Sequence, residues 1–373
     1  MQKEYIDKYQ LFALIIIFQI GSTTLFALGI DAKQDAWMVI LIALGAGLGL
    51  TWLYTEIQKH FPHQNLMEIL VSVLGKWIAI PFIILYAIFF FYISTFILYE
   101  FAQFMIINFF QETPIQAILL ITISLVMYCL FLGIEAKARS SQIVFPYLMF
   151  FILSIYFLSL ISGIGKIEQL SPTLENGIMP IMKATPSVIT FPFGEMIVFL
   201  MYWCYVNNKQ EIRRISLLAV GISGILLTIS LGFMIAVLGV HGAATAQFPL
   251  FKIIQKINIG DFIQRLDAIG GAILFIGGFY KMTLYFNASR LAVETLINKK
   301  NQKWLMVLMG VLWYWFILVY FPTFSFYREV AINVINPYLM LPYQFILPFL
   351  LLMIIKLKIK LQQKQGRNIH VRS

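Results

Sequence analysis

Long apolar segments recur along the whole chain and are separated by short polar ones. A helix needs about 20 residues to cross a hydrocarbon core about 30 Å thick, and most of these segments have that length. They do not show the alternation of apolar and polar positions typical of a membrane β-barrel, so we expect helices to satisfy the backbone hydrogen bonds in lipid. The pattern therefore predicts an all-α integral membrane protein. Its ten predicted spans are residues 11–30, 37–55, 78–107, 115–134, 142–162, 184–206, 214–240, 267–297, 304–321 and 336–355.

The composition indicates that nearly all of the chain lies in the membrane. Hydrophobic residues make up 60% of the sequence, charged residues make up 12%, and the mean hydropathy is +0.85. Soluble domains are far less apolar. We expect a cytoplasmic N-terminus at residues 1–10, a single transmembrane domain at residues 11–355 and a basic cytoplasmic tail at residues 356–373. The charged N-terminus is not followed by a cleavage site with small residues, so the first span is expected to stay in the mature protein.

Lysine and arginine are distributed unequally between the two sides of the predicted spans. One side holds only Lys33, Lys166, Lys183, Lys252, Lys256, Arg265 and Arg328. The other basic residues, apart from Lys281 deep in a span, belong to the opposite side, which is therefore predicted to be cytoplasmic and to hold both termini. These flanks and their contact with anionic lipid account for the net charge of +10. We therefore expect the lipid bilayer, and not nucleic acid, as the partner of the basic residues.

Three connecting segments are too long to be simple turns. Residues 56–77 are too polar to cross a membrane and are predicted to form an interfacial or amphipathic connector. Residues 166–183 and 246–266 are predicted to be long outer loops, which serve either as functional lids or as structural caps.

Two predicted spans are interrupted by residues that weaken a helix. Gly21-Ser22-Thr23-Thr24 lies in the middle of the first span, where glycine loosens the backbone and hydroxyl groups can replace its partners. In the sixth span, Pro186 and the run Phe191-Pro192-Phe193-Gly194-Glu195 favour an unwound segment. These spans are the first members of two five-helix halves, residues 11–162 and 184–355. The pattern therefore predicts a five-plus-five inverted repeat with a substrate site at the two breaks.

A broken helix near the middle of the membrane exposes unpaired N–H and C=O groups. The amino end of a half-helix attracts a carboxylate, and the carboxyl end attracts an ammonium group or a cation. A zwitterionic α-amino acid carries both charges at a short separation. It is therefore the first ligand that we expect.

Three ionisable residues fall deep inside predicted spans, where a charge costs a few kcal/mol. Glu195 is interpreted either as a cap of the second half-helix or as a group that binds a ligand ammonium or carries a proton. Lys281 has no carboxylate one turn before or after it, so its ammonium is expected to reach another helix, water or a ligand. It either couples the protein to protons or extends into a cavity. Glu100 is expected to pair with a basic residue or to lie in a polar core, and Arg290 to anchor the end of its helix at the membrane surface.

Neither the cysteines nor the histidines indicate a metal site or a catalytic site. Cys129 and Cys204 lie in apolar segments without a C-x-x-C spacing, and the four histidines are scattered. We therefore expect no cofactor, no metal and no enzyme activity.

Several motifs resemble those of the spore germination permeases. They are Phe18-Gln19-Ile20-Gly21, Asp35-Ala36-Trp37, Gly177-Ile178-Met179-Pro180-Ile181, Phe191-Pro192-Phe193-Gly194-Glu195, and Arg265-Leu266-Asp267-Ala268 followed by Lys281. Members of this family are the membrane-embedded B subunits of nutrient germinant receptors in spore-forming Firmicutes, and they belong to the amino acid–polyamine–organocation superfamily. The resemblance covers nearly the whole chain.

The resemblance implies a multi-pass protein of the spore inner membrane that senses a small germinant, usually an amino acid. It implies an A-type subunit and a C-type lipoprotein as partners, no enzyme activity, and a pocket between the first, third, sixth and eighth spans. The implied ligand-binding residues are Gly21, Ser22, Thr23, Thr24, Tyr99, Phe191, Phe193, Gly194, Glu195, Thr283 and Tyr285. The residues expected to couple ions or protons are Lys281, Glu195 and Glu100. A proton-coupled amino-acid permease built from the same helices is the alternative.

Overall fold

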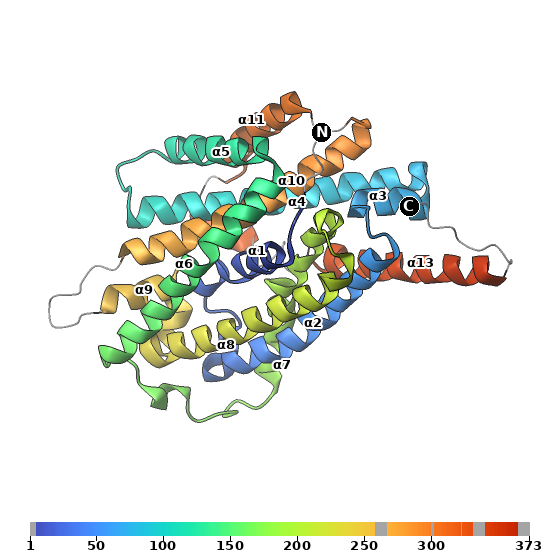
Figure 1. Cartoon of the computed structure of the whole chain (residues 1–373). Coiled ribbons are helices and arrows are strands. Elements are labelled where there is room, and N and C mark those ends of the chain that lie inside the picture. The colour runs from blue at the N-terminus through green and yellow to red at the C-terminus, as the bar shows by residue number, and fades with distance from the viewer. Residues whose placement is uncertain (1–4, 258–266, 300–301, 322, 331–339, 365–373) are drawn as a thin grey trace.

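The computed structural model describes residues 5–257, 267–299, 302–321, 323–330 and 340–364. These residues form helices joined by turns and loops (Figure 1). The α-helices are α1 (Lys8–Ile20), α2 (Ala36–His60), α3 (Leu66–Leu74), α4 (Lys76–Asn108), α5 (Ile115–Phe131), α6 (Gly133–Ile161), α7 (Met179–Thr190), α8 (Ile212–Thr245), α9 (Pro249–Lys256), α10 (Asp267–Ile297), α11 (Lys303–Tyr320), α12 (Phe324–Val330) and α13 (Leu347–Lys364). The short 3-10 helices are η1 (Thr23–Leu25), η2 (Ile30–Asp35), η3 (Ile167–Leu170), η4 (Phe193–Met201), η5 (Trp203–Tyr205) and η6 (Lys209–Glu211), and η8 (Pro342–Ile346) is a π-helix.

Eight helical segments in the described part of the chain are long and apolar enough to cross a membrane. They are Lys8–Leu25, Ile30–His60, Lys76–Asn108, Gly133–Ile161, Met179–Met201, Lys209–Thr245, Asp267–Ile297 and Lys303–Tyr320. The prediction of an all-α, multi-pass membrane protein is therefore confirmed.

Two of the ten predicted spans are not among these eight. α5 has 17 residues, fewer than the about 20 that a span usually needs. The predicted tenth span, at 336–355, begins outside the described residues, and α13 carries Lys356, Lys358 and Lys360 in its second half. α10, in contrast, ends at Ile297, the predicted end of the eighth span, and is helical from Asp267, the first described residue of this segment.

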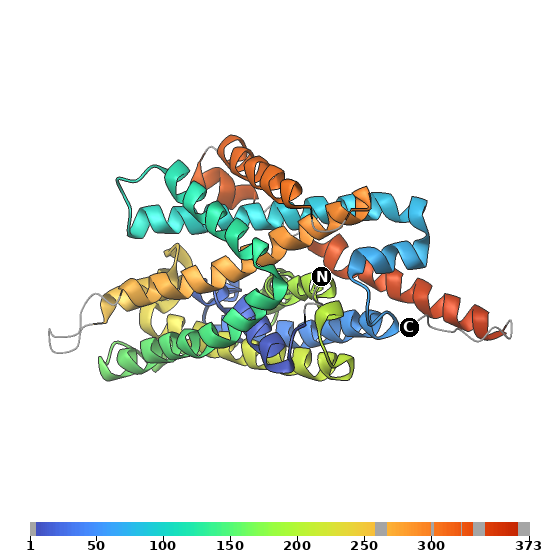
Figure 2. The same ribbon diagram turned by 45° about the horizontal axis from the view of Figure 1, so that its top comes forward.

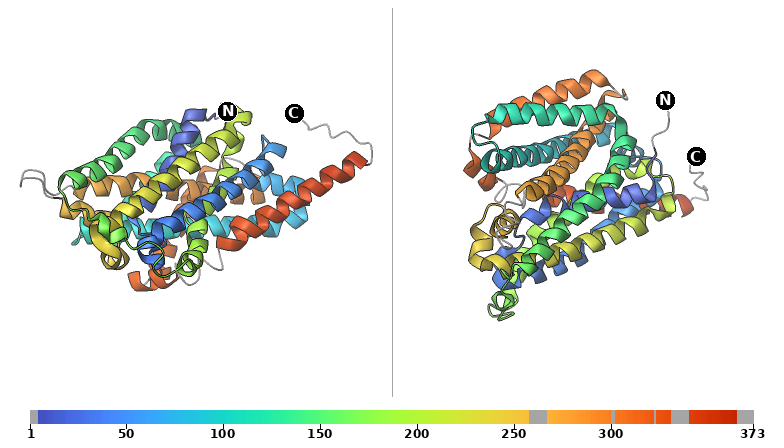
Figure 3. Two further views of the ribbon diagram at one scale, coloured as in Figure 1. Left: turned by 90° about the horizontal axis from the view of Figure 1, so that it is seen from below. Right: turned by 60° about the vertical axis from the view of Figure 1, so that its left-hand side comes forward.

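α1 lies in the middle of the helical bundle (Figures 1 and 2). It packs against α6, α8 and α10, and residues 13–25 are buried without interruption. α10 runs along α4, while α2 lies beside α7 and α8. Figure 3 shows the bundle from two further directions, with α13 running along α2 and α3 and extending beyond them. The residues of α1 thus lie where several long helices meet.

The predicted connector at 56–77 contains the last turn of α2 and all of α3. Asn65 caps α3, because its side chain accepts hydrogen bonds from the N–H groups of Met67 and Glu68. The Glu68 carboxylate in turn accepts one from the N–H of Asn65, at 3.1 Å. The apolar face of α3 is buried, and the helix packs against α4. Such packing is typical of an amphipathic helix.

The two predicted outer loops both contain helical turns. η3 lies in the first loop, and α7 begins at Met179, before the predicted start of the sixth span. α9 lies in the second loop, whose residues 258–266 are outside the described part. Asp35, at the end of η2, holds the first loop through both carboxylate oxygens, which accept the N–H of Leu174 at 3.0 and 3.1 Å.

Candidate functional site

The regular part of α1 ends at Ile20, where Gly21 approaches α10. A β-carbon on Gly21 would lie 2.2 Å from the Cα atom of Gly277, and one on Gly277 would lie 2.1 Å from the carbonyl carbon of Gly21. No side chain fits between these two backbones, so both positions require glycine. Gly277 lies about one helical turn before Lys281. The close approach therefore brings the end of α1 to the part of α10 that carries this lysine.

The chain changes conformation between α7 and η4. Phe191 has an extended backbone, and the 3-10 helix η4 begins two residues later. Gly194 lies against Gln344, since a β-carbon there would be 2.2 Å from the Oε1 atom of that side chain. The Tyr54 hydroxyl lies within hydrogen-bonding distance of the carbonyl oxygens of Gly194, at 3.3 Å, and Gln344, at 2.6 Å. α2 thus supplies a donor to a carbonyl group of η4.

Glu195 and Lys281 form an ion pair in the interior of the bundle. The Lys281 Nζ and Glu195 Oε2 atoms are 2.5 Å apart, and both side chains are 1% exposed. The Tyr285 hydroxyl, one turn further along α10, donates a hydrogen bond to Glu195 Oε1 at 3.2 Å. Lys281 therefore reaches a carboxylate of another element, which is one of the possibilities that the sequence left open.

Aromatic rings surround the ammonium group of Lys281. Its Nζ atom lies 4.2 Å from the ring centroid of Phe191 and 5.3 Å from that of Phe18. The Phe18 ring also packs against Phe199 and Tyr285, with centroid separations of 5.2 and 5.6 Å. The faces of aromatic rings attract cations, so these rings stabilise the ammonium group in addition to the carboxylate. The site combines one buried pair of opposite charges with an apolar wall.

Several polar groups near the end of α1 have no hydrogen-bond partner in the described part of the chain. They are both side-chain amide atoms of Gln19 and the hydroxyl groups of Thr23 and Thr24. All three residues, and Ser22 beside them, are buried. A buried polar group without a partner costs about 1–3 kcal/mol, so such groups are uncommon in native interiors. Their concentration at one helix end is typical of a place where water or a polar ligand supplies the missing bonds.

Two of the predicted residues on α4 have their direct contacts with the segment that follows α11. The Tyr99 ring stacks on Phe321 with a centroid separation of 4.6 Å. Glu100 forms a side-chain hydrogen bond with Tyr327 and lies within electrostatic range of Glu195 and Lys281. These two residues therefore form a cluster separate from the Glu195–Lys281 pair.

The predicted site residues differ in whether they contact the ion pair directly. Glu195, Lys281, Tyr285 and Phe191 are in direct contact. The Thr283 hydroxyl instead donates to a carbonyl oxygen of its own helix. Phe193 packs on Gly47 of α2, where a β-carbon would lie 2.5 Å from the Phe193 Cβ atom. The structure thus brings part of the predicted set together and places the rest on its periphery.

Several residues around this site were not assigned to it from the sequence, among them Phe18, Gln19, Tyr54, Gly277 and Gln344. The Gly277-Gly278 pair within an apolar span is a signal of close helix approach and could have been used. No local pattern distinguishes Tyr54 or Gln344 from other polar residues of the spans, because their roles depend on neighbours distant in sequence.

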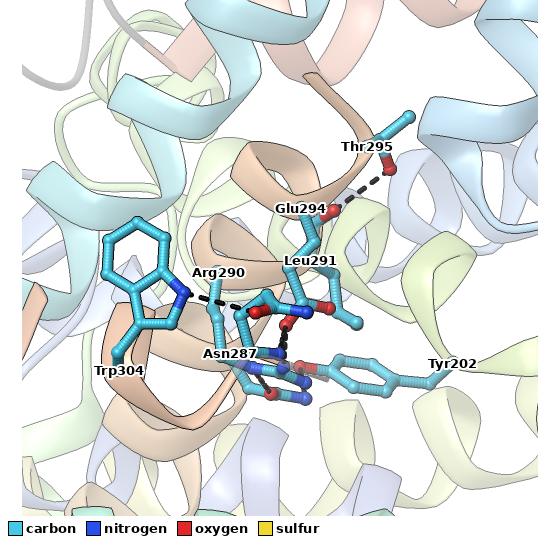
Figure 4. Close-up of polar contacts among 8 residues, drawn as sticks. Tyr202, Asn287, Arg290, Leu291, Glu294, Thr295 and Trp304 are labelled. Carbon is cyan, nitrogen blue, oxygen red and sulfur yellow. Dashed lines mark hydrogen bonds and ion pairs between the residues drawn. The ribbon is translucent and has the colours of Figure 1, made fainter. Parts of the chain in front are cut away.

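A second buried polar cluster lies further along α10 (Figure 4). The Arg290 Nε atom donates to Asn287 Oδ1 at 2.9 Å, and Nη1 donates to Glu294 Oε1 at 2.5 Å. The Asn287 amide donates to the Tyr202 hydroxyl at 3.3 Å. The sequence predicts that Arg290 anchors the end of its helix at the membrane surface, whereas the structure shows its side chain buried and bonded to protein groups. Its charge is compensated inside the protein by a carboxylate on the same helix.

A cavity of about 230 Å³ lies beside this second cluster. Residues of α5, α6, α10 and α11 line it, together with Tyr205. None of the predicted ligand-binding residues is among its lining residues. The cavity and the Glu195–Lys281 pair are therefore two different places in the bundle.

The described residues contain no group of three or more His, Cys, Asp and Glu side chains that could hold a metal ion. Cys129 and Cys204 are not joined by a disulfide. The side chains in contact at the ion pair offer carboxylate, ammonium and hydroxyl groups.

Comparison with known proteins places the chain among proteins of spore germination. Residues 5–325 match the spore permease family model, which is described as "Spore germination protein". The chain is 31% identical to Spore germination protein KB of Bacillus subtilis over 365 residues, which cover 98% of each chain. It is 25% identical to Spore germination protein A2 of the same organism over 88% of each chain, and 22% identical to Spore germination protein YndE over 75% of this chain and 77% of that one.

Proposed function

Because this chain belongs to the spore germination protein family, we propose that it is the membrane-embedded subunit of a nutrient germinant receptor. Its ligand is a small nutrient, most simply an α-amino acid, and its role is to sense this ligand without acting as an enzyme. Its partners are an A-type receptor subunit and a C-type lipoprotein. Its location is the inner membrane of the spore, with both termini on the cytoplasmic side.

The buried ion pair between Glu195 and Lys281 is the observation that carries this proposal. A charge left alone in such a place is strongly unfavourable, so an occupant that separates the pair must compensate both charges. A zwitterionic amino acid does this: its ammonium group binds Glu195 and its carboxylate binds Lys281. Binding then separates η4 from α10, and the partner subunits respond to this change in the population of states.

The proposed site lies where the interrupted ends of α1 and α7 meet α10. Its members are Gly21, Ser22, Thr23 and Thr24 of the first break, Phe191, Phe193, Gly194 and Glu195 of the second, and Thr283 and Tyr285 of α10. The unpaired hydroxyls of Thr23 and Thr24 support a polar ligand at the first break. In the five-plus-five architecture that we propose, α1 and α7 begin the two repeats, 11–162 and 184–355, and the breaks provide half-helix ends for a charged ligand.

Direct binding tests the proposal. The full-length protein is reconstituted in nanodiscs and titrated calorimetrically with each of the twenty common amino acids. We expect at least one to bind, and we expect E195Q to raise its Kd at least tenfold. The matched control is E56Q, which alters a carboxylate on α2 that pairs with Arg213 outside the site. Absence of binding by every amino acid, or equal affinity of wild type and E195Q, would contradict the proposal.

A proton-coupled amino-acid permease is the second candidate. It is favoured by the same buried pair, because a proton taken up by Glu195 would release Lys281. Glu100 lies within electrostatic range of both residues and is a further carboxyl group that could carry a proton. Uptake into liposomes separates the two functions. Concentrative uptake of the bound amino acid, driven by a proton gradient and without partner subunits, supports the permease; binding without uptake supports the receptor.

A further inference from the structure

The cavity of about 230 Å³ between α5, α6, α10 and α11 is lined by basic and neutral residues only. Its polar lining residues are Lys137, Tyr205, Asn287, Arg290 and Lys303, and its apolar lining includes Leu130, Phe131 and Met306. No acidic side chain is among the lining residues. The cavity therefore has a strongly positive polar side and an apolar side.

The charge of Lys137 is the least compensated in this cavity. Its side chain is only 5% exposed, and its Nζ atom has no hydrogen-bond partner in the described part of the chain. Arg290 lies within electrostatic range of it and adds a charge of the same sign. Glu294 compensates Arg290 by a direct ion pair, whereas Lys137 has no such carboxylate among the described residues. An isolated buried ammonium group is unfavourable unless an anion joins it.

Two helices begin at this cavity. Gly133 and Ile134 of α6 line it, as does Lys303 of α11. Neither helix has a side-chain cap. The first N–H groups of a helix and its dipole favour an anion, so the start of α6 adds to the positive potential. At the start of α11, the N–H of Gln302 already donates to the Glu294 carboxylate at 3.1 Å, so this end adds less. Glu135 in the first turn of α6 does not cancel this effect fully, because it pairs with Arg139.

We propose that this cavity binds a phosphate-type anion, either free phosphate or the phosphate of an anionic phospholipid headgroup. Lys137 supplies the central positive charge, and Arg290, Lys303 and the amide of Asn287 supply further donors. The volume lies below the roughly 300–1,000 Å³ of pockets for drug-sized ligands, so it fits a compact group. The apolar wall formed by Leu130, Phe131 and Met306 suits the apolar part of a lipid. The site is independent of Glu195 and Lys281, and thus of the proposed germinant site.

The test uses the full-length protein purified in a neutral detergent and stripped of lipid. Thermal unfolding is followed by tryptophan fluorescence while either sodium phosphate or dioctanoyl phosphatidylglycerol is added. Sodium chloride at the same ionic strength and dioctanoyl phosphatidylcholine, which has no net charge, are the reference additions. We expect a saturable rise of the melting temperature with at least one anion, because a ligand that binds only the folded state stabilises it.

The variant K137Q decides whether the anion lies in this cavity. We expect it to raise the Kd of the anion at least tenfold, and K137R to restore binding. The control K59Q removes an exposed lysine of α2 and should leave the Kd unchanged. If K137Q does not fold, K303Q, at an exposed position on the rim, should weaken binding several-fold instead.

Each outcome has a defined meaning. Stabilisation by both anions assigns a phosphate site, stabilisation by phosphatidylglycerol alone assigns a lipid site, and stabilisation by phosphate alone assigns a site for a soluble anion. The proposal is overturned if neither anion stabilises the protein more than its reference addition, or if K137Q and K303Q bind as wild type does.

Discussion

Glu195 and Lys281 are both buried, and each compensates the charge of the other. Either charge alone would be unfavourable inside the bundle. The sequence identified both residues as unusual, because ionisable side chains are rare inside spans. It did not identify them as partners, since they are brought together by the contact of η4 with α10 and not by their spacing. Phe18 and Tyr285 complete the surroundings of the pair from α1 and α10. Single residues could thus be predicted at this scale, but their contacts could not.

Removing one member of the pair should be more harmful than removing both. We expect K281M to destabilise the protein by about 3–5 kcal/mol, because Glu195 is left buried without its cation. The double variant E195Q/K281M leaves no isolated charge and should recover a substantial part of this loss. Unfolding in detergent, followed by tryptophan fluorescence, measures both. A double variant as unstable as K281M would show that the attraction between the two charges is not what stabilises this region.

The contact of Gly21 with Gly277 allows a second test with single residues. G21A places a methyl group 2.2 Å from the backbone of α10, and we expect it to cost about 1–3 kcal/mol, as overpacking does. A β-carbon on Gly221 of α8 would have no neighbouring atom within 4 Å, and alanine there should stabilise the helix by up to about 1 kcal/mol. The same unfolding measurement compares G21A with G221A. Equal stability of the two variants would mean that α1 and α10 can separate at this point without cost.

At the scale of elements, the hydrophobic pattern predicts helices well where a long apolar segment has polar ends. α10 ends at Ile297, as predicted, because the polar residues after Ile297 limit its apolar segment. α7 begins earlier than predicted, because Pro180 suits the first turn of a helix and does not prevent its start at Met179. In the connector at 56–77, no clear boundary separates charged from apolar residues, so the sequence does not reveal that α3 is a separate helix with its own cap.

The Asp35 side chain connects two such elements and can be tested directly. Its carboxylate accepts the N–H of Leu174, whose φ of 59° lies in the left-handed region, so it holds an unfavourable backbone conformation in place. We expect D35A to increase hydrogen exchange at residues 171–178, with little change in the helices. The control is D31A, because Asp31 lies on the same short helix but is exposed. Exchange in D35A equal to that in D31A would show that the loop is held by other contacts.

At the scale of the whole molecule, the sequence predicts a membrane protein, the sides of its loops and a five-plus-five repeat, but its hydrophobic pattern does not show which helices pack against one another. The packing of α4 along α10 and the central position of α1 join segments far apart in the chain. Apolar residues face both lipid and protein in such a bundle, so hydrophobicity does not distinguish the two. Buried polar residues carry more information about the interior, so the prediction of a candidate site rests on a few charges and glycines.

The number of crossings depends on α5, and the distribution of basic residues predicts that this helix does cross. Lys76 begins α4 and Arg139 lies near the start of α6, and the excess of basic residues assigns both to the cytoplasmic side. In this prediction α4 leaves that side and α6 begins on it, so the helix between them returns. Its 17 residues span about 25 Å at 1.5 Å per residue, and a bilayer can thin locally to accommodate a short span.

In a variant lacking its native cysteines (C129A/C204A), we expect E112C to react with a membrane-impermeant maleimide in intact cells. R139C and the control K59C should react only after the membrane is permeabilised. All three positions are exposed on the protein, so differences in labelling report the side of the membrane. Equal labelling of E112C and R139C in intact cells would place both ends of α5 on one side and exclude it as a span.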